Sequence, residues 1–126
     1  MRKEKMNIFK LKKNNPEQVI VQKCYLATHP IDKFFGLMGE DTLFSEEGLL
    51  IEKCNSIHMW FMKCALDILF LKKIDQKSWQ VLSIHENVKP WKMLPLSHLK
   101  ADDTLEVNTG FINKNGIQHG DLLCTE

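Results

Sequence analysis

The sequence lacks the segments that would place the chain in a membrane and the motifs that would assign it to a common enzyme class. It has no run of about eighteen apolar residues, so no transmembrane helix is predicted. It contains no H-E-x-x-H, no G-x-S-x-G and no glycine-rich phosphate loop, which weakens zinc-peptidase, α/β-hydrolase and nucleotide-binding interpretations. The formal net charge is only +1, so no overall field is expected to attract nucleic acid.

The cysteine spacing also excludes several functions. The four cysteines, Cys24, Cys54, Cys64 and Cys124, form no C-x-x-C pair, which excludes a zinc ribbon and a thioredoxin-type redox motif. Basic residues gather in the first fifteen positions, but no apolar stretch follows them. We therefore expect no export signal, a cytoplasmic location, reduced thiols and a basic segment that is a solvated tail. No cofactor is predicted.

The remaining pattern indicates one folded domain. Hydrophobic residues make up 44% and charged residues 26% of the 126 positions, which is ordinary globular composition. We divide the chain into a basic arm with a first strand (residues 1–16) and a single domain (residues 17–126). Strands are predicted over 18–26, 49–51, 56–72 (split near Ala65), 79–86, 104–108 and 122–124, with short helices over 28–39 and 110–116. This order predicts a mainly β fold, a β-sandwich or an open barrel.

Soft metal ligands are concentrated in one segment. Cys54, His58, Met62 and Cys64 fall within eleven residues, and sulfur together with imidazole suits copper(I). If residues 56–64 form a strand, His58, Met62 and Cys64 share one face. Same-face neighbours on a strand are about 7 Å apart, however, so one strand does not easily close around a metal, and core packing is the competing interpretation.

Two carboxylates are candidates for acid–base chemistry. Asp67 interrupts an apolar run, so it must find partners or shift its pKa. It is either a general acid or base beside His58, or a structural acid that accepts backbone N–H bonds or pairs with Lys63. Glu106 lies between Leu105 and Val107, so it points away from their shared face, and we expect it to be exposed to solvent.

Aromatic residues could line a groove for an apolar ligand, but most of them are expected in the core. These are Trp60, Phe61, Trp79 and Trp91.

The order of several short motifs resembles the bacterial and archaeal family known as domain of unknown function 192 (DUF192, also called UPF0127). The matching segments are Phe35-Gly36-Leu37-Met38, Glu47-Gly48-Leu49-Leu50, Ser56-Ile57-His58, Phe61-Met62-Lys63, Leu66 to Leu71, Lys89-Pro90-Trp91, Thr104 to Val107 with Gly110, Gly116-Ile117 and Gly120-Asp121. The resemblance implies a compact, mainly β domain with small helical pieces and no established activity. The family positions carried by this chain are Gly36, Leu37, Met38, His58, Met62, Lys63, Asp67, Phe70, Glu106, Gly110, Gly120 and Asp121.

The chain departs from this family pattern in three ways. Relatives often have Asn-Thr or Phe-Pro where this sequence has Cys64-Ala65. Many relatives have arginine where this sequence has Phe35, so an arginine partner for a carboxylate is missing. Many relatives also carry an export signal, so their periplasmic roles do not transfer.

These observations lead to one main hypothesis and two alternatives. The main hypothesis is a non-catalytic ligand-binding or accessory module, whose partner is a small molecule or a protein and which is a monomer or weak dimer. Its pocket would be bordered by His58, Met62, Lys63, Asp67 and Trp91. The first alternative is a small hydrolase or isomerase that uses Asp67 or Glu106 with His58. The second is a copper(I) site built from Cys54, His58, Met62 and Cys64.

Overall fold

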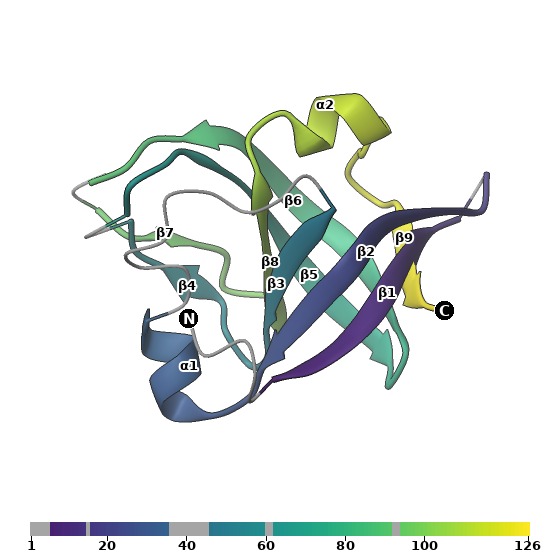
Figure 1. Cartoon of the computed structure of the whole chain (residues 1–126), viewed down its shortest axis with the longest axis horizontal. Helices are drawn as coiled ribbons and strands as arrows, with labels where there is room; N and C mark the ends of the chain where they lie inside the picture. Colours follow the sequence, from purple (N-terminus) through teal and green to yellow (C-terminus); the bar gives the residue numbers. More distant parts are fainter. Residues whose placement is uncertain (1–5, 15, 36–45, 60–61, 92–93) are drawn as a thin grey trace.

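The computed structural model describes residues 6–14, 16–35, 46–59, 62–91 and 94–126. Strands form most of this part of the chain, with two short helices (Figure 1). The strands are β1 (Asn7–Lys13), β2 (Gln18–Ala27), β3 (Glu47–Ile51), β4 (Ser56–Ile57), β5 (Leu66–Asp75), β6 (Ser78–Val88), β7 (Leu96–Ser97), β8 (Asp103–Asn108) and β9 (Leu122–Thr125). The helices are α1 (Pro30–Phe35) and α2 (Phe111–Asn115). Neither of these helices has the length and hydropathy that crossing a bilayer requires.

Seven of the strands form a closed barrel in the order β1-β2-β3-β8-β5-β6-β9. The barrel closes because β9 pairs with both β1 and β6. The β2–β3 pair is parallel, and the other barrel pairs are antiparallel. The prediction of a mainly β single domain is confirmed, and the sheet is a closed barrel.

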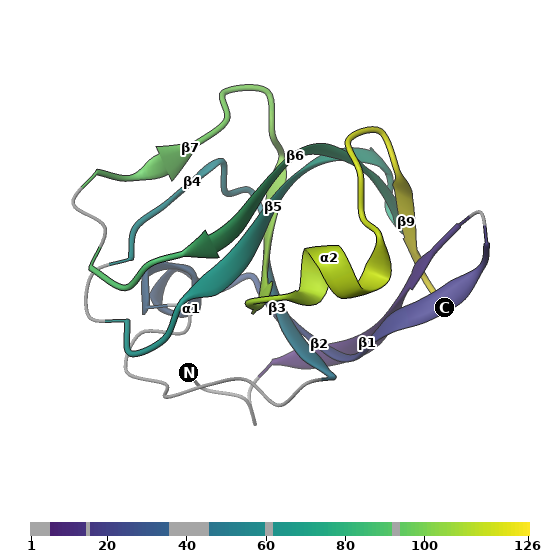
Figure 2. The same ribbon diagram turned by 90° about the horizontal axis from the view of Figure 1, so that it is seen from above.

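The two faces of the barrel wall contact two different hydrophobic clusters. The interior cluster includes Leu50, Leu69, Leu105 and Leu123, together with Phe111 of α2. Because α2 contributes to this cluster, it closes one end of the barrel, as the view in Figure 2 shows.

The outer cluster lies between the barrel wall and the two-stranded β4–β7 sheet. It includes Leu49, Ile57, Met59 and Ile68, with Leu96 packed against it. The prediction that residues 68–71 are buried on both faces is therefore confirmed. Their apolar run is continuous because the inward positions contact the interior cluster and the outward positions contact the outer cluster.

The strand predicted over 56–64 is wrong for the described residues 58, 59 and 62–64, which are not in a strand. Among the described residues of this range, only Ser56 and Ile57 pair with another strand, namely β7. The carbonyl of Met59 accepts hydrogen bonds from the backbone N–H groups of Met62 (3.3 Å) and Trp91 (2.8 Å). A carbonyl bonded in this way is not available for a strand ladder.

Both predicted helical segments are present where the structure describes them. α1 begins at Pro30, as the sequence indicates, whereas residues 36–39 of the prediction lie outside the described residues. α2 ends at Asn115 and is capped by Gly116, whose φ of 60° is left-handed, so the predicted glycine cap is confirmed.

Candidate functional site

Four of the five residues predicted to border a pocket lie on two neighbouring loops. His58, Met62 and Lys63 are on the β4–β5 connection, and Trp91 is on the β6–β7 connection. The bond from the Trp91 N–H to the Met59 carbonyl joins the two loops. Met62 is buried in the outer cluster, His58 is half-buried, and Lys63 and Trp91 are exposed. Trp60 and Phe61, also predicted as groove residues, lie outside the described residues, as do Gly36, Leu37 and Met38.

Asp67 faces the other way, into the barrel. Its neighbours Leu66 and Ile68 contact the outer cluster, so alternation turns the Asp67 side chain inward. It is fully buried. Its two carboxylate oxygens accept hydrogen bonds from the backbone N–H groups of Asn87 (2.8 Å) and Ile112 (2.9 Å). The structural interpretation of Asp67, an acid near a strand start that accepts backbone N–H bonds, is confirmed.

Glu106 is the residue whose environment differs most from the prediction. The expectation of solvent exposure is wrong, because Glu106 is only 4% exposed. The predicted alternation is correct, since Leu105 and Val107 face the interior cluster and Glu106 faces outward. The outward face, however, is covered by the outer cluster. The strand register places Glu106 between Leu49 of β3 and Ile68 of β5, which are both members of that cluster.

This burial changes the acid–base properties of Glu106. No hydrogen bond or ion pair to its carboxyl group is formed by the residues that the structure describes. Removal from water without a compensating charge favours the neutral form, and it raises the pKa of Glu106 to about 7. The carboxyl group is therefore close to half-ionised at neutral pH.

A second buried acid shares this face of the wall. Glu47 of β3 is 5% exposed, and the Tyr25 hydroxyl donates a hydrogen bond to its Oε2 atom at 2.9 Å. Burial, together with this bond to Glu47, raises the pKa of Tyr25. Glu47 lies two residues before Leu49, the cross-strand partner of Glu106, so the two acids are diagonal neighbours on the same face. We call Tyr25, Glu47 and Glu106 the outer-face acidic cluster.

Sequence reasoning missed two members of this cluster. Tyr25 and Glu47 become neighbours only because β2 and β3 pair in parallel, with Lys23 opposite Glu47 and Tyr25 opposite Leu49. The alternation within each strand gives no information about such a pairing. The one available signal was Glu47 itself, a charged residue that directly precedes the buried run of β3.

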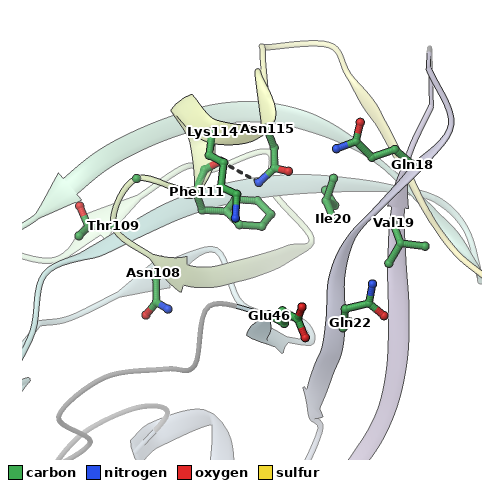
Figure 3. Close-up of a pocket in the computed structure, with 11 residues that line it drawn as sticks. Gln18, Val19, Ile20, Gln22, Glu46, Asn108, Thr109, Phe111, Lys114 and Asn115 are labelled. Atoms are coloured by element: carbon green, nitrogen blue, oxygen red, sulfur yellow. Dashed lines mark hydrogen bonds between the residues drawn. The ribbon is translucent and has the colours of Figure 1, made fainter.

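A cavity of about 480 Å³ opens near the closed end of the barrel (Figure 3). Ile20 and Phe111 give it an apolar part, and the remaining lining is largely amide and charged side chains: Gln18, Gln22, Glu46, Asn108, Lys114 and Asn115. Asn108 lies two residues from Glu106 on the same face of β8.

The positions of Asp67 and Glu106 bear on the alternative of a hydrolase or isomerase that uses one of these acids with His58. Both oxygens of Asp67 are already bonded to backbone N–H groups inside the barrel. Glu106 lies on the opposite face of the wall, the face that also contacts Met59, the residue after His58. A pairing of Glu106 with His58 stays a prediction.

The four candidate copper ligands do not lie on one common strand. The Cys54 Sγ atom donates a hydrogen bond to the Ser56 carbonyl at 3.1 Å, and Met62 is buried in the outer cluster. In the part of the chain that is described, no three His, Cys, Asp or Glu side chains are grouped so that they could hold a metal ion. Methionine is not among these four residue types, so a copper(I) site that uses the thioether of Met62 is not tested by this observation. The copper(I) alternative therefore also stays a prediction.

Comparisons with known proteins agree with this fold. A crystal structure from Sinorhizobium meliloti 1021, named "putative transcription regulator", superposes with a TM-score of 0.83 at 20% identity, covering 95% of each chain. A protein of unknown function from Novosphingobium aromaticivorans superposes with a TM-score of 0.75 at 24% identity, covering 94% of this chain and 84% of the other.

At such identities these structures show a shared fold alone. The search among curated proteins found no match. The family model for DUF192, described as an uncharacterised ACR, matches residues 10–124, which is nearly the whole barrel with its covering layer. The chain therefore belongs to the DUF192 family.

Proposed function

We propose that this domain is a non-catalytic ligand-binding module, which holds a small molecule bearing a cationic or hydrogen-bond-donating group against the outer wall of the barrel. The observation that carries the proposal is Glu106, a carboxyl group that is 4% exposed and has no partner among the described residues. A buried polar group without a partner destabilises the folded state unless something compensates it. A ligand that donates a hydrogen bond or brings a positive charge would supply that compensation.

The surroundings of Glu106 favour binding of a ligand with both polar and apolar parts. Tyr25 and Glu47 provide further polar atoms on the same face, and Leu49 and Ile68 provide apolar surface. We assign His58 and Met62 to the inner part of this site and Lys63 and Trp91 to its exposed rim. Asp67, in this proposal, has a supporting role, because it holds α2 from inside the barrel.

The test uses short alkylamines and alkylguanidines as probes, with thermal unfolding as the measurement at pH 8, where Glu106 is mostly ionised. We expect these cations to raise the melting temperature of the wild-type chain and of a control variant, Glu46→Gln, whose side chain is exposed. In Glu106→Gln the rise should disappear. The proposal fails if none of the cations stabilises the wild-type chain, or if Glu106→Gln responds as the control does.

A second candidate is a small hydrolase that uses Glu106 as a general base. The observation that favours it is the pKa of about 7, which leaves the carboxyl group able to accept a proton near neutral pH. Hydrolysis of an activated ester such as p-nitrophenyl acetate should then increase with pH, with an inflection near pH 7, and should be lost in Glu106→Gln. Equal rates for the wild-type chain and Glu106→Gln would exclude this candidate.

A further inference from the structure

Large apolar side chains are exposed to water on both sides of β7. Leu99 is 91% exposed, Leu94 is 72% exposed, and Trp91 is 56% exposed. These are three of the six large hydrophobic side chains that are exposed in the described part of the chain, and they fall within nine positions. Leu94 and Leu99 are five residues apart, so they are separated by at most about 18 Å. Exposed apolar surface that is concentrated in this way is typical of an interaction site.

Backbone hydrogen bonds hold the segment that carries Leu99. The His98 N–H donates to the Asn55 carbonyl at 2.9 Å, which joins the end of β7 to the residue before β4. The His98 carbonyl accepts a bond from the Ala101 N–H at 3.0 Å, which closes the turn over Leu99. On the other side of this turn, Leu96 packs against the outer cluster. The fold therefore presents Leu99 to the solvent on a bonded turn.

The lysines around these apolar side chains give the covering layer a positive charge. Residues 53–66 and 89–100, which contain β4, β7 and the loops beside them, include five lysines and no Asp or Glu. The whole chain has a formal net charge of only +1, so positive charge is concentrated in this layer. The lysines of the layer that the structure describes are all exposed: Lys53, Lys63, Lys89 and Lys100.

The acids that adjoin these two segments in the chain do not balance the lysines. Asp67 faces the barrel interior, where it accepts backbone N–H bonds. Asp102 lies 3.5 Å from the ammonium group of Lys72, which compensates its charge. Glu52 lines a cavity of about 310 Å³ whose lining includes no residue of the two segments. Glu86 is exposed, and its single negative charge offsets one of the five lysines.

We infer that the β7 side of the covering layer binds reversibly to the surface of a lipid bilayer that contains anionic lipids. Leucine side chains enter the boundary between headgroups and acyl chains, and tryptophan is favoured at the depth of the headgroups. Lysines beside them are attracted to anionic headgroups. A nucleic acid would match the lysines but would leave Leu94 and Leu99 exposed to water. This inference does not depend on the function proposed for Glu106, which is buried beneath the layer.

The experiment measures co-sedimentation of the full chain with sucrose-loaded vesicles. One set of vesicles contains phosphatidylcholine alone, and the other also contains phosphatidylglycerol, which is anionic. We expect the partition coefficient of the wild-type chain to be higher for the anionic vesicles by on the order of tenfold. Added salt should lower it, because ions screen the attraction between lysines and headgroups.

Two leucine variants test the apolar contribution. Leu94→Ser and Leu99→Ser should each lower the partition coefficient for the anionic vesicles by on the order of tenfold. The matched control is Ile74→Ser, since Ile74 is 55% exposed but belongs to the β5–β6 hairpin. Figures 1 and 2 show this hairpin on the opposite side of the molecule from β4 and β7. Ile74→Ser should bind the vesicles as the wild-type chain does.

Lysine variants test the contribution of charge in the same way. Lys89→Gln and Lys100→Gln should each weaken binding to the anionic vesicles, whereas Lys77→Gln, an exposed substitution in the β5–β6 hairpin, should not. The melting temperature of each variant verifies that it is folded. Glu106→Gln should bind the vesicles as the wild-type chain does, so the failure of this inference is distinguishable from the failure of the proposed function.

Three results would overturn the inference. The first is that the wild-type chain does not sediment with the anionic vesicles. The second is that it binds equally to vesicles with and without phosphatidylglycerol. The third is that Leu94→Ser and Leu99→Ser bind as well as Ile74→Ser, which would show attraction by charge alone.

Discussion

Two buried acids on neighbouring strands have opposite environments, although both lie within the wall of the barrel. Asp67 on β5 faces inward, and each of its oxygens accepts a backbone N–H bond. Glu106 on β8 faces outward and is buried without such a bond. Asp67 therefore stabilises the folded state, whereas the burial of the Glu106 carboxyl group destabilises it.

Removing the Asp67 carboxylate should destabilise the protein strongly. In Asp67→Ala, the two backbone N–H groups that donate to the carboxylate lose their acceptor. We therefore expect the free energy of unfolding to fall by about 2–5 kcal/mol. Asp67→Asn keeps one acceptor oxygen and should lose less. The control is Asp75→Ala, since Asp75 accepts its bond from Lys77 in an exposed turn. Urea unfolding measures all three variants, and equal losses for Asp67→Ala and Asp75→Ala would contradict the interpretation.

The raised pKa of Glu106 predicts a pH dependence of stability. The folded state holds this proton more tightly than the unfolded state, because the pKa is about 7 instead of 4.5. The stabilisation from the protonated carboxyl group is complete below about pH 4.5 and is lost as the pH rises through 7. Between about pH 4 and pH 8 the wild-type chain should lose about 3 kcal/mol through this group.

Glu106→Gln should lack this component, so its advantage over the wild-type chain should grow with pH. Urea unfolding of both proteins across this range isolates the contribution of Glu106 from those of other groups. A difference between the two proteins that does not vary with pH would show that the carboxyl group titrates normally.

At the scale of the element, α2 is a five-residue helix that depends on its surroundings. A helix this short is not stable by itself in water. Its position is fixed by the bond from the Ile112 N–H to Asp67, by Phe111 in the interior cluster and by left-handed glycines at both ends, with φ of 93° at Gly110 and 60° at Gly116.

The glycine cap gives a prediction at this scale. Gly116→Ala should lower the free energy of unfolding by about 1 kcal/mol, because an L residue is strained at positive φ. Steric conflict adds little, since the nearest atom to an added Cβ is the Lys13 Nζ at 3.9 Å. Lys114→Ala, an exposed substitution in the same helix, serves as the control and should change stability by less than about 0.5 kcal/mol. Thermal unfolding of the two variants gives the comparison, and similar values would argue against backbone strain.

At the scale of the whole molecule, the two hydrophobic clusters share the same strands. Leu49 contacts the outer cluster and Leu50 the interior cluster, although they are adjacent in β3. Alternate residues of β5 and β8 divide in the same way: on β8, Leu105 faces inward and Glu106 outward. Because every such strand is part of both layers, we expect the barrel and its covering layer to unfold together.

This cooperativity can be measured with one substitution in each cluster. Leu49→Ala and Leu105→Ala both replace side chains that are 0% exposed. Each should lower the free energy of unfolding by about 2–5 kcal/mol while leaving a single transition. The transition should coincide when it is followed by circular dichroism and by tryptophan fluorescence. A separate early transition in Leu49→Ala would show that the outer layer is an independent unit.

The sequence by itself determined the local features of this protein. Alternation along 104–108 predicted the strand and the outward direction of Glu106, the apolar run at 68–71 predicted burial on two faces, and Gly116 predicted the end of a helix. These features follow from backbone geometry and from the period of side chains within one segment, so they can be predicted without knowledge of neighbouring strands.

Only the tertiary structure decided what covers each face. Glu106 is buried because a second layer packs on the outside of the barrel, and Tyr25 meets Glu47 because β2 and β3 pair in parallel. Asp67 is satisfied because α2 folds back over the end of the barrel. Alternation states that two residues point in opposite directions, but whether water or protein lies on each side depends on contacts between segments far apart in the chain.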